Sequence, residues 1–166
     1  MRIILAVRAL FFVFLLPGMV AGYIPYRLLT SAHQLDWPRL SIPSGLASLV
    51  CAVGASVLLW CVWEFFAAGH GTLAPIDPPK HLVVSGLYRI TRDPMYNGVA
   101  CLLLGEAWLF SSVPLLKYAL AVMVFFHLFV VIYEEPTLEH RFGESYQNYK
   151  GAVPRWGFTI NPFQGP

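Results

Sequence analysis

Long apolar runs separated by short polar stretches dominate the chain. Four of them stand out, at about residues 3–23, 42–68, 95–113 and 115–133. Each is near the roughly 20 residues that an α-helix needs to cross the hydrocarbon core of a bilayer. The pattern therefore predicts an all-α integral membrane protein with about four transmembrane helices.

The ends of these runs carry helix signals. Pro43 stands at the start of the second run, and Asp93-Pro94 comes directly before the third. Proline suits the first turn of a helix, and aspartate suits the N-cap position before it. The third and fourth runs are separated by only residues 111–114. We therefore expect them to form a tight antiparallel hairpin.

Composition supports the membrane assignment. The chain of 166 residues is 57% hydrophobic and 12% charged, whereas soluble domains have about 45–50% apolar and about 25% charged residues. Its net charge of +2 does not suggest a nucleic-acid partner. Arg2, an apolar stretch and Val20-Ala21-Gly22 together resemble a signal peptide. We interpret this stretch as the first membrane helix.

The distribution of lysine and arginine predicts the orientation, because cytoplasmic loops are enriched in these residues. A cytoplasmic N-terminus places seven of them on the cytoplasmic side and three on the other. The cytoplasmic set is Arg2, Lys80, Arg89, Arg92, Arg141, Lys150 and Arg155, and the opposite set is Arg27, Arg39 and Lys117. Both termini are then expected in the cytoplasm.

Three polar clusters are expected to meet at the cytoplasmic face. They are residues 85–98 before the third run, Glu134-Glu135-Pro136 after the fourth, and the tail from Arg141 to Arg155. A hairpin would bring the first two side by side. The tail predicts a short cytoplasmic helix that is interrupted at Gly143, whereas the proline-rich residues 74–79 predict an extended connector.

The adjacent glutamates Glu134 and Glu135 need an explanation, since a helix C-terminus disfavours anions. We expect Pro136 to break the helix at this point. Partly desolvated carboxylates need cations or several hydrogen-bond donors. One interpretation is pairing with arginines, and the other is a ligand that carries positive charge or hydroxyl groups. The candidate arginines are Arg89, Arg92, Arg141 and Arg155.

The order of these motifs resembles a known family. Gly-x-Tyr-x-x-x-Arg-x-Pro-Met-Tyr-x-Gly begins at Gly86, and Glu-Glu-Pro-x-Leu-x-x-x-Phe-Gly-x-x-Tyr-x-x-Tyr-x-x-x-Val-Pro-Arg begins at Glu134. With the apolar hairpin between them, they resemble the isoprenylcysteine carboxyl methyltransferases. That family is grouped with the phospholipid methyltransferases, which are membrane enzymes that use S-adenosylmethionine. The resemblance covers about residues 82–155, and residues 1–68 add two helices without a recognised signature.

The resemblance implies a cofactor-binding core at residues 82–155 within a single domain, 1–166. The implied S-adenosylmethionine-binding residues are Gly86, Tyr88, Pro94, Tyr96, Glu134, Glu135, Leu138, Tyr146, Tyr149 and Arg155. Arg92 is expected to orient the methyl acceptor, and Glu134 is a second candidate catalytic residue. Asp93 stands where the family commonly has histidine, so it either contacts the cofactor or only caps the helix.

Ionisable residues inside apolar runs form a further group, because such residues are rare and often functional. His127 lies seven residues before Glu134, on the same face of an α-helix, and is a candidate tunnel residue or base. The alternative for His127 is an interhelical hydrogen bond. Glu64 and Glu106 are either structural or functional.

A metal site is not expected. The histidines show no paired ligand spacing, and Cys51, Cys61 and Cys101 are expected to be small buried hydrophobic residues. Methyl transfer from a sulfonium also needs alignment and exclusion of water rather than a metal.

The predicted function is S-adenosylmethionine-dependent methyl transfer in the membrane, with S-adenosylhomocysteine as product. The acceptor would be lipophilic or small and would offer a thiol, a carboxylate or an amine. The alternative is a non-catalytic membrane scaffold or transporter-like module that keeps the helical hairpin.

Overall fold

The computed structural model describes residues 17–34, 41–68, 82 and 84–164. Within these residues every regular element is helical and there is no strand, which confirms the all-α class there. The elements are η1 (Met19–Tyr23), α2 (Ile24–Ser31), α3 (Ile42–Ala68), η2 (Gly86–Arg89), α4 (Pro94–Leu109), α5 (Val113–Phe129), η3 (Val130–Glu134), α6 (Glu135–Phe142) and α7 (Glu144–Ala152). Two of them, η1 and η3, are π-helical turns, and η2 is a 3₁₀ turn.

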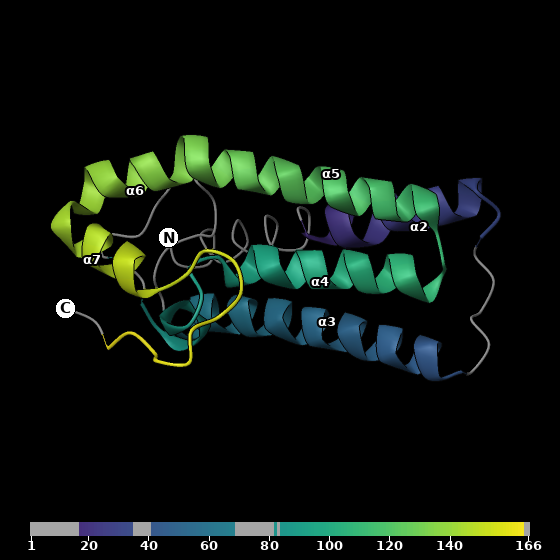
Figure 1. Ribbon diagram of the computed structural model, residues 1–166, viewed down its shortest axis with the longest axis horizontal. Coiled ribbons are helices and arrows are strands. Elements are labelled where there is room, and N and C mark those ends of the chain that lie inside the picture. The colour runs from purple at the N-terminus through teal and green to yellow at the C-terminus, as the bar shows by residue number, and fades with distance from the viewer. Residues whose placement is uncertain (1–16, 35–40, 69–81, 83, 165–166) are drawn as a thin grey trace.

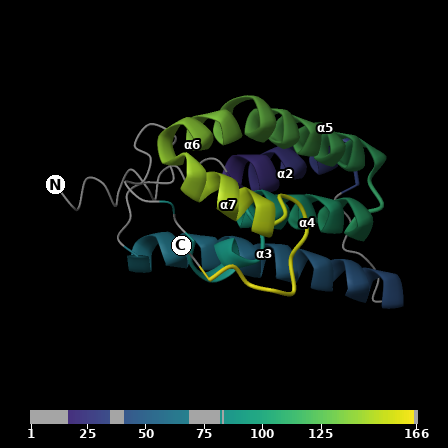
Figure 2. The same cartoon turned by 60° about the vertical axis from the view of Figure 1, so that its left-hand side comes forward.

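Helices α3, α4 and α5 lie along the long axis of the molecule, with α4 between the other two (Figure 1). Successive helices run in opposite directions, and only residues 110–112 join α4 to α5. Helix α2 and η1 pack on α5 and α4. Helices α6 and α7 stand at one end, and the chain after α7 turns back toward the start of α4 (Figure 2).

Among the described residues, two helices are long and apolar enough to cross a membrane, Ile42–Glu64 and Val113–Phe142. Large apolar side chains are exposed on both of them, including Trp63 on α3 and Phe125 on α5. Such surfaces suit contact with lipid. Four spans and the cytoplasmic orientation remain predictions, and residues 3–16 of the first apolar run lie outside the described residues, as does the connector 74–79.

Small residues bring α3 and α4 into close contact. A Cβ added at Gly54 would lie 2.7 Å from the backbone nitrogen of Leu102, and one at Gly105 would lie 2.9 Å from that of Cys51. Ala47 is fully buried in the same contact region. Close approach of backbones through small residues is typical of helices packed in membranes, where van der Waals contact drives association.

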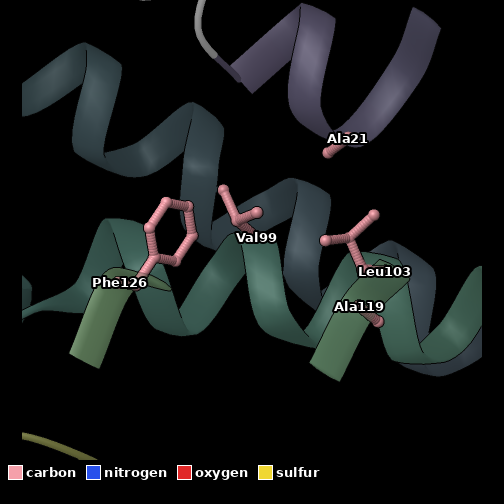
Figure 3. Packing of buried hydrophobic residues seen from close by; sticks show 5 residues of the cluster. All are labelled: Ala21, Val99, Leu103, Ala119 and Phe126. Carbon is pink, nitrogen blue, oxygen red and sulfur yellow. The ribbon is translucent and has the colours of Figure 1, made fainter. Parts of the chain in front are cut away.

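The apolar core lies between η1, α4 and α5. Figure 3 shows Ala21 from η1 above Val99 and Leu103 of α4, with Ala119 and Phe126 from α5. All five are buried, and Leu103 and Ala119 are fully so. This packing holds the start of α4 and the end of α5 in fixed relation, and these are the ends that carry the polar clusters.

The expectation that Pro136 breaks the helix was wrong. Glu134 and Glu135 both have helical backbone angles, and the chain remains helical from α5 through η3 into α6. Pro136 stands in the first turn of α6, directly after η3, and has no N–H to donate to the preceding turn. The wider turn of η3 lets the Glu135 N–H reach the carbonyl of Val130, and the Thr137 hydroxyl donates to the Tyr133 carbonyl over 2.6 Å. The predicted interruption at Gly143 is confirmed, with φ of 53° between α6 and α7.

Candidate active site

The C-terminal segment lies directly against the residues that precede α4. The Arg92 N–H donates to the carbonyl of Pro154 over 3.0 Å, and the Thr159 N–H donates to the carbonyl of Ile90 over 2.8 Å. The Thr91 hydroxyl adds a bond to the carbonyl of Arg155. These contacts bring the tail beside the first motif, and the side chains described next bring both to the two glutamates.

Glu135 is the centre of a buried cluster of ion pairs. Its Oε1 accepts from Arg92 Nη1 over 2.9 Å and from Arg155 Nε over 2.7 Å, and its Oε2 lies 3.2 Å from Lys150 Nζ. The Glu135 side chain is only 7% exposed. For this glutamate, the arginine-pairing interpretation is the one that the structure supports. The other two candidate arginines have different contacts, since Arg89 donates to the carbonyl of Phe163 and Arg141 lies over the Phe142 ring.

Glu134 has a different environment although it is the next residue. Its Oε2 accepts a hydrogen bond from the Tyr96 hydroxyl over 3.2 Å. Among the described residues it forms no ion pair. The two carboxylates therefore divide their roles, with Glu135 neutralised by cations of the chain and Glu134 left with capacity to accept further hydrogen bonds.

Asp93 does not cap α4 with its side chain, contrary to one of the two interpretations. The Asn97 N–H bonds to the backbone carbonyl of Asp93, and the carboxylate makes no capping bond. Its Oδ2 is buried without a hydrogen-bond partner among the described residues. Burial, and then the nearby charge of Glu134, raise the pKa of Asp93 to about 7, although Arg92 opposes the shift. The carboxylate is turned into the molecule rather than toward the helix N-terminus.

Arg92 contributes an unused donor to the same region. Its Nη1 holds Glu135, but its Nε is buried and has no partner in the described part of the chain. Buried polar atoms without partners are uncommon in folded proteins and call for a physical explanation. Here an unused donor and the unused acceptor of Asp93 belong to adjacent residues. A ligand with both acceptors and donors would satisfy them.

Several residues that the resemblance assigned to the cofactor are packed against protein. Tyr146 and Tyr149 form a buried cluster with Val153, and Leu138 packs against it. The Tyr149 hydroxyl donates to the carbonyl of Tyr88 over 2.6 Å. Burial is the largest cause that raises the pKa of Tyr146 to about 12. These contacts fix α7 and the tail on the turn η2. Pro94 is likewise buried, at the start of α4.

His127 lies at the outer surface of α5. Its side chain is exposed, and its Nδ1 accepts a hydrogen bond from Trp156 Nε1 over 3.2 Å. The wider turn η3 lies between His127 and Glu134, so the seven-residue spacing no longer puts both on one face. The partner of His127 is thus a tail residue rather than another helix. A catalytic role for His127 remains a prediction.

Sequence reasoning missed three contributors to this site. Lys150 binds both Glu135 and Glu139, the latter over 2.6 Å, and the Asn97 amide donates to the Thr91 hydroxyl over 2.9 Å. A buried carboxylate needs several cationic partners. Lys150 lies in the same tail as Arg155, so this need could have suggested it. The Asn97–Thr91 bond has no comparable signal in the sequence.

Neither metal ligands nor disulfides appear in the described residues. They contain no group of three or more histidine, cysteine, aspartate or glutamate side chains that could hold a metal ion. All three cysteines are free, and Cys61 is fully buried.

The comparison with protein families agrees with the arrangement of the motifs. A family model described as phospholipid methyltransferase matches residues 45–145, which is more than half of the chain. The chain belongs to the phospholipid methyltransferase family. In this family member the match begins in α3 and includes Arg92, Glu134 and Glu135. No curated protein and no solved structure matched the chain.

Proposed function

We propose that this phospholipid methyltransferase family member is an enzyme that transfers a methyl group from S-adenosylmethionine to a lipophilic or small acceptor in the membrane. Family membership supports methyl transfer. The observation that carries the choice of donor is the division between Glu134 and Glu135. One carboxylate is saturated by three cations, while its neighbour accepts only the Tyr96 hydroxyl among the contacts of the described residues.

The donor's groups fit the polar atoms that lack partners. When bound, S-adenosylmethionine supplies a methyl group activated by a sulfonium, together with an ammonium, a ribose diol and a carboxylate. Glu134 and Asp93 offer acceptors for cationic and hydroxyl groups, and Arg92 Nε offers a donor for an anionic oxygen. The residues present therefore suit this group.

The surrounding contacts keep these groups in place. Tyr96 stacks on Phe126 with ring centroids 4.6 Å apart, so its hydroxyl holds Glu134 from a fixed ring. Glu135 holds both Arg92 and Arg155 through its oxygen Oε1. Such preorganisation favours a reaction that depends on alignment. The Arg92 guanidinium remains our choice for orienting the acceptor.

A lipophilic acceptor would approach from the bilayer. The exposed apolar faces of α3 and α5 suit lipid contact, and the polar cluster lies at one end of both helices. Thiols, carboxylates and neutral amines all provide an electron pair for in-line displacement, so the acceptor class stays open among these three.

Binding of S-adenosylhomocysteine tests the proposal. Calorimetric titration of purified protein in lipid nanodiscs should show saturable binding, and Glu134→Gln should weaken it at least tenfold. Glu139→Gln is the matched control, because Glu139 is half-exposed and bonds only Lys150 among the described residues. If the unaltered protein shows no binding, the enzyme assignment fails and the scaffold alternative gains support.

A further inference from the structure

Glu64 on α3, outside the two motifs, reaches the turn η2 that leads into Arg92 and Asp93. One oxygen of its carboxylate occupies the position that a Cβ would take at Gly86. Gly86 also has a φ of 50°, a backbone conformation that favours glycine. Glycine at this position therefore allows the end of α3 and the turn η2 to fit together through the Glu64 carboxylate.

The second oxygen of Glu64 has no assigned role. Oε2 is buried and has no hydrogen-bond partner among the described residues. A buried carboxylate oxygen without a donor is unfavourable, so a ligand that supplies a hydrogen-bond donor would stabilise it. An isosteric neutral substitution tests whether the carboxylate is needed for such a contact.

The turn that Glu64 contacts belongs to the candidate active site. It continues through Ile90 and Thr91 into Arg92 and Asp93, which carry two of the other unpartnered atoms. Tyr88 within the turn is partly buried, and its desolvation raises its pKa, with the charges of Asp93 and Glu134 acting in the same direction. Glu64 thus lies on the side of this turn that α3 covers.

We propose that Glu64 is a third ligand-binding carboxylate of the site, which accepts a hydrogen bond from a cationic or hydroxyl-bearing group of a bound substrate. The inference rests on the proposed function. That group has two possible sources, the methyl donor with its ammonium and ribose hydroxyls, or the polar head of the acceptor. The resemblance assigned Gly86 to cofactor contact. In this proposal its role is to leave space for the Glu64 carboxylate, because it has no Cβ.

Glu64→Gln is the decisive variant, because it keeps the shape of the side chain and removes its charge. Glu106→Gln is the matched control, since Glu106 on α4 also has a buried oxygen without a described partner. Two measurements are needed, the affinity for S-adenosylhomocysteine and the lipid concentration at half-maximal methyl transfer into vesicles of host polar lipids. Gly86→Ala, which displaces the carboxylate, provides a second variant, and thermal melting shows whether each variant is folded.

Weakening of S-adenosylhomocysteine binding by tenfold or more in Glu64→Gln, but not in Glu106→Gln, assigns Glu64 to the donor. Unchanged affinity with a tenfold higher lipid requirement assigns it to the acceptor. If both the S-adenosylhomocysteine affinity and the lipid requirement of Glu64→Gln stay within twofold of the unaltered protein, Glu64 is a packing residue and the inference is overturned. If the unaltered protein itself neither binds nor methylates, the proposed function fails first.

Discussion

Glu134 and Glu135 are adjacent in one helical turn, yet Glu135 is bound by Arg92, Arg155 and Lys150, whereas Glu134 accepts a single described bond from Tyr96. The π-helical turn η3, which ends at Glu134, shifts the helical phase and so sets the direction of both side chains. π-Helical turns inside α-helices are often found at functional sites. The contrast between the two carboxylates leads to different predictions for each.

Glu135→Gln should destabilise the fold strongly. Loss of the carboxylate leaves Arg92 buried with an unpaired charge, and breaking a buried pair in this way costs about 3–5 kcal/mol. Glu139→Gln removes a half-exposed pair with Lys150 and should cost less than about 1 kcal/mol. Denaturant titration in mild detergent, followed by circular dichroism, compares the two. Equal losses would contradict the central position given to Glu135.

Asp93 should make stability depend on pH. Its pKa is about 7 in the folded protein against an ordinary value of 3.8, so the folded state binds the proton more tightly. The contribution of Asp93 to stability should be greatest below about pH 4, fall by up to about 4 kcal/mol as the pH rises toward 7, and level off above that. Asp93→Asn should abolish this part of the pH dependence. Melting curves of both proteins from pH 4 to 8 give the difference, and parallel profiles would contradict the assignment.

The close packing of α3 on α4 should not tolerate larger side chains at the glycines of the contact. Gly105→Ala places a methyl group 2.6 Å from the sulfur and 2.9 Å from the backbone nitrogen of Cys51, so we expect a loss of about 1–3 kcal/mol. Gly45→Ala is the control on α3, because nothing lies within 4 Å of its added Cβ. There the change should be neutral or stabilising by up to about 1 kcal/mol. Thermal melting that shows the same shift for both would exclude this account of the interface.

Much of the fold follows from the apolar pattern. The second run became α3 with the bounds Ile42–Ala68, and the third and fourth runs correspond to α4 and α5. These runs could be predicted because burial or lipid contact requires continuous apolar length. The continuation of the helix through Pro136 could not be predicted. It depends on η3 and on the Thr137 hydroxyl, and neither has a signal in the sequence.

The sequence predicted which residues belong to the candidate site better than it predicted their individual contacts. The motifs indicated that Arg92, the glutamates and Arg155 belong together, and Arg92 and Arg155 both bind Glu135, whereas Glu134 bonds Tyr96. The direction of each side chain decides which of the two glutamates pairs with the cations. The sequence does not specify this direction for two adjacent residues. The same holds for Glu64, whose contact with Gly86 joins two segments 22 residues apart in the chain.

The most direct test of the central claim is transfer of a radiolabelled methyl group. Purified protein in vesicles of host polar lipids is incubated with S-adenosylmethionine labelled in the methyl group, and the extracted lipids and small molecules are counted. We predict time-dependent incorporation by the unaltered protein and by Glu139→Gln, with at least a hundredfold loss in Glu134→Gln. Incorporation that is absent from the folded, unaltered protein, or that persists at full rate in Glu134→Gln, would contradict the account.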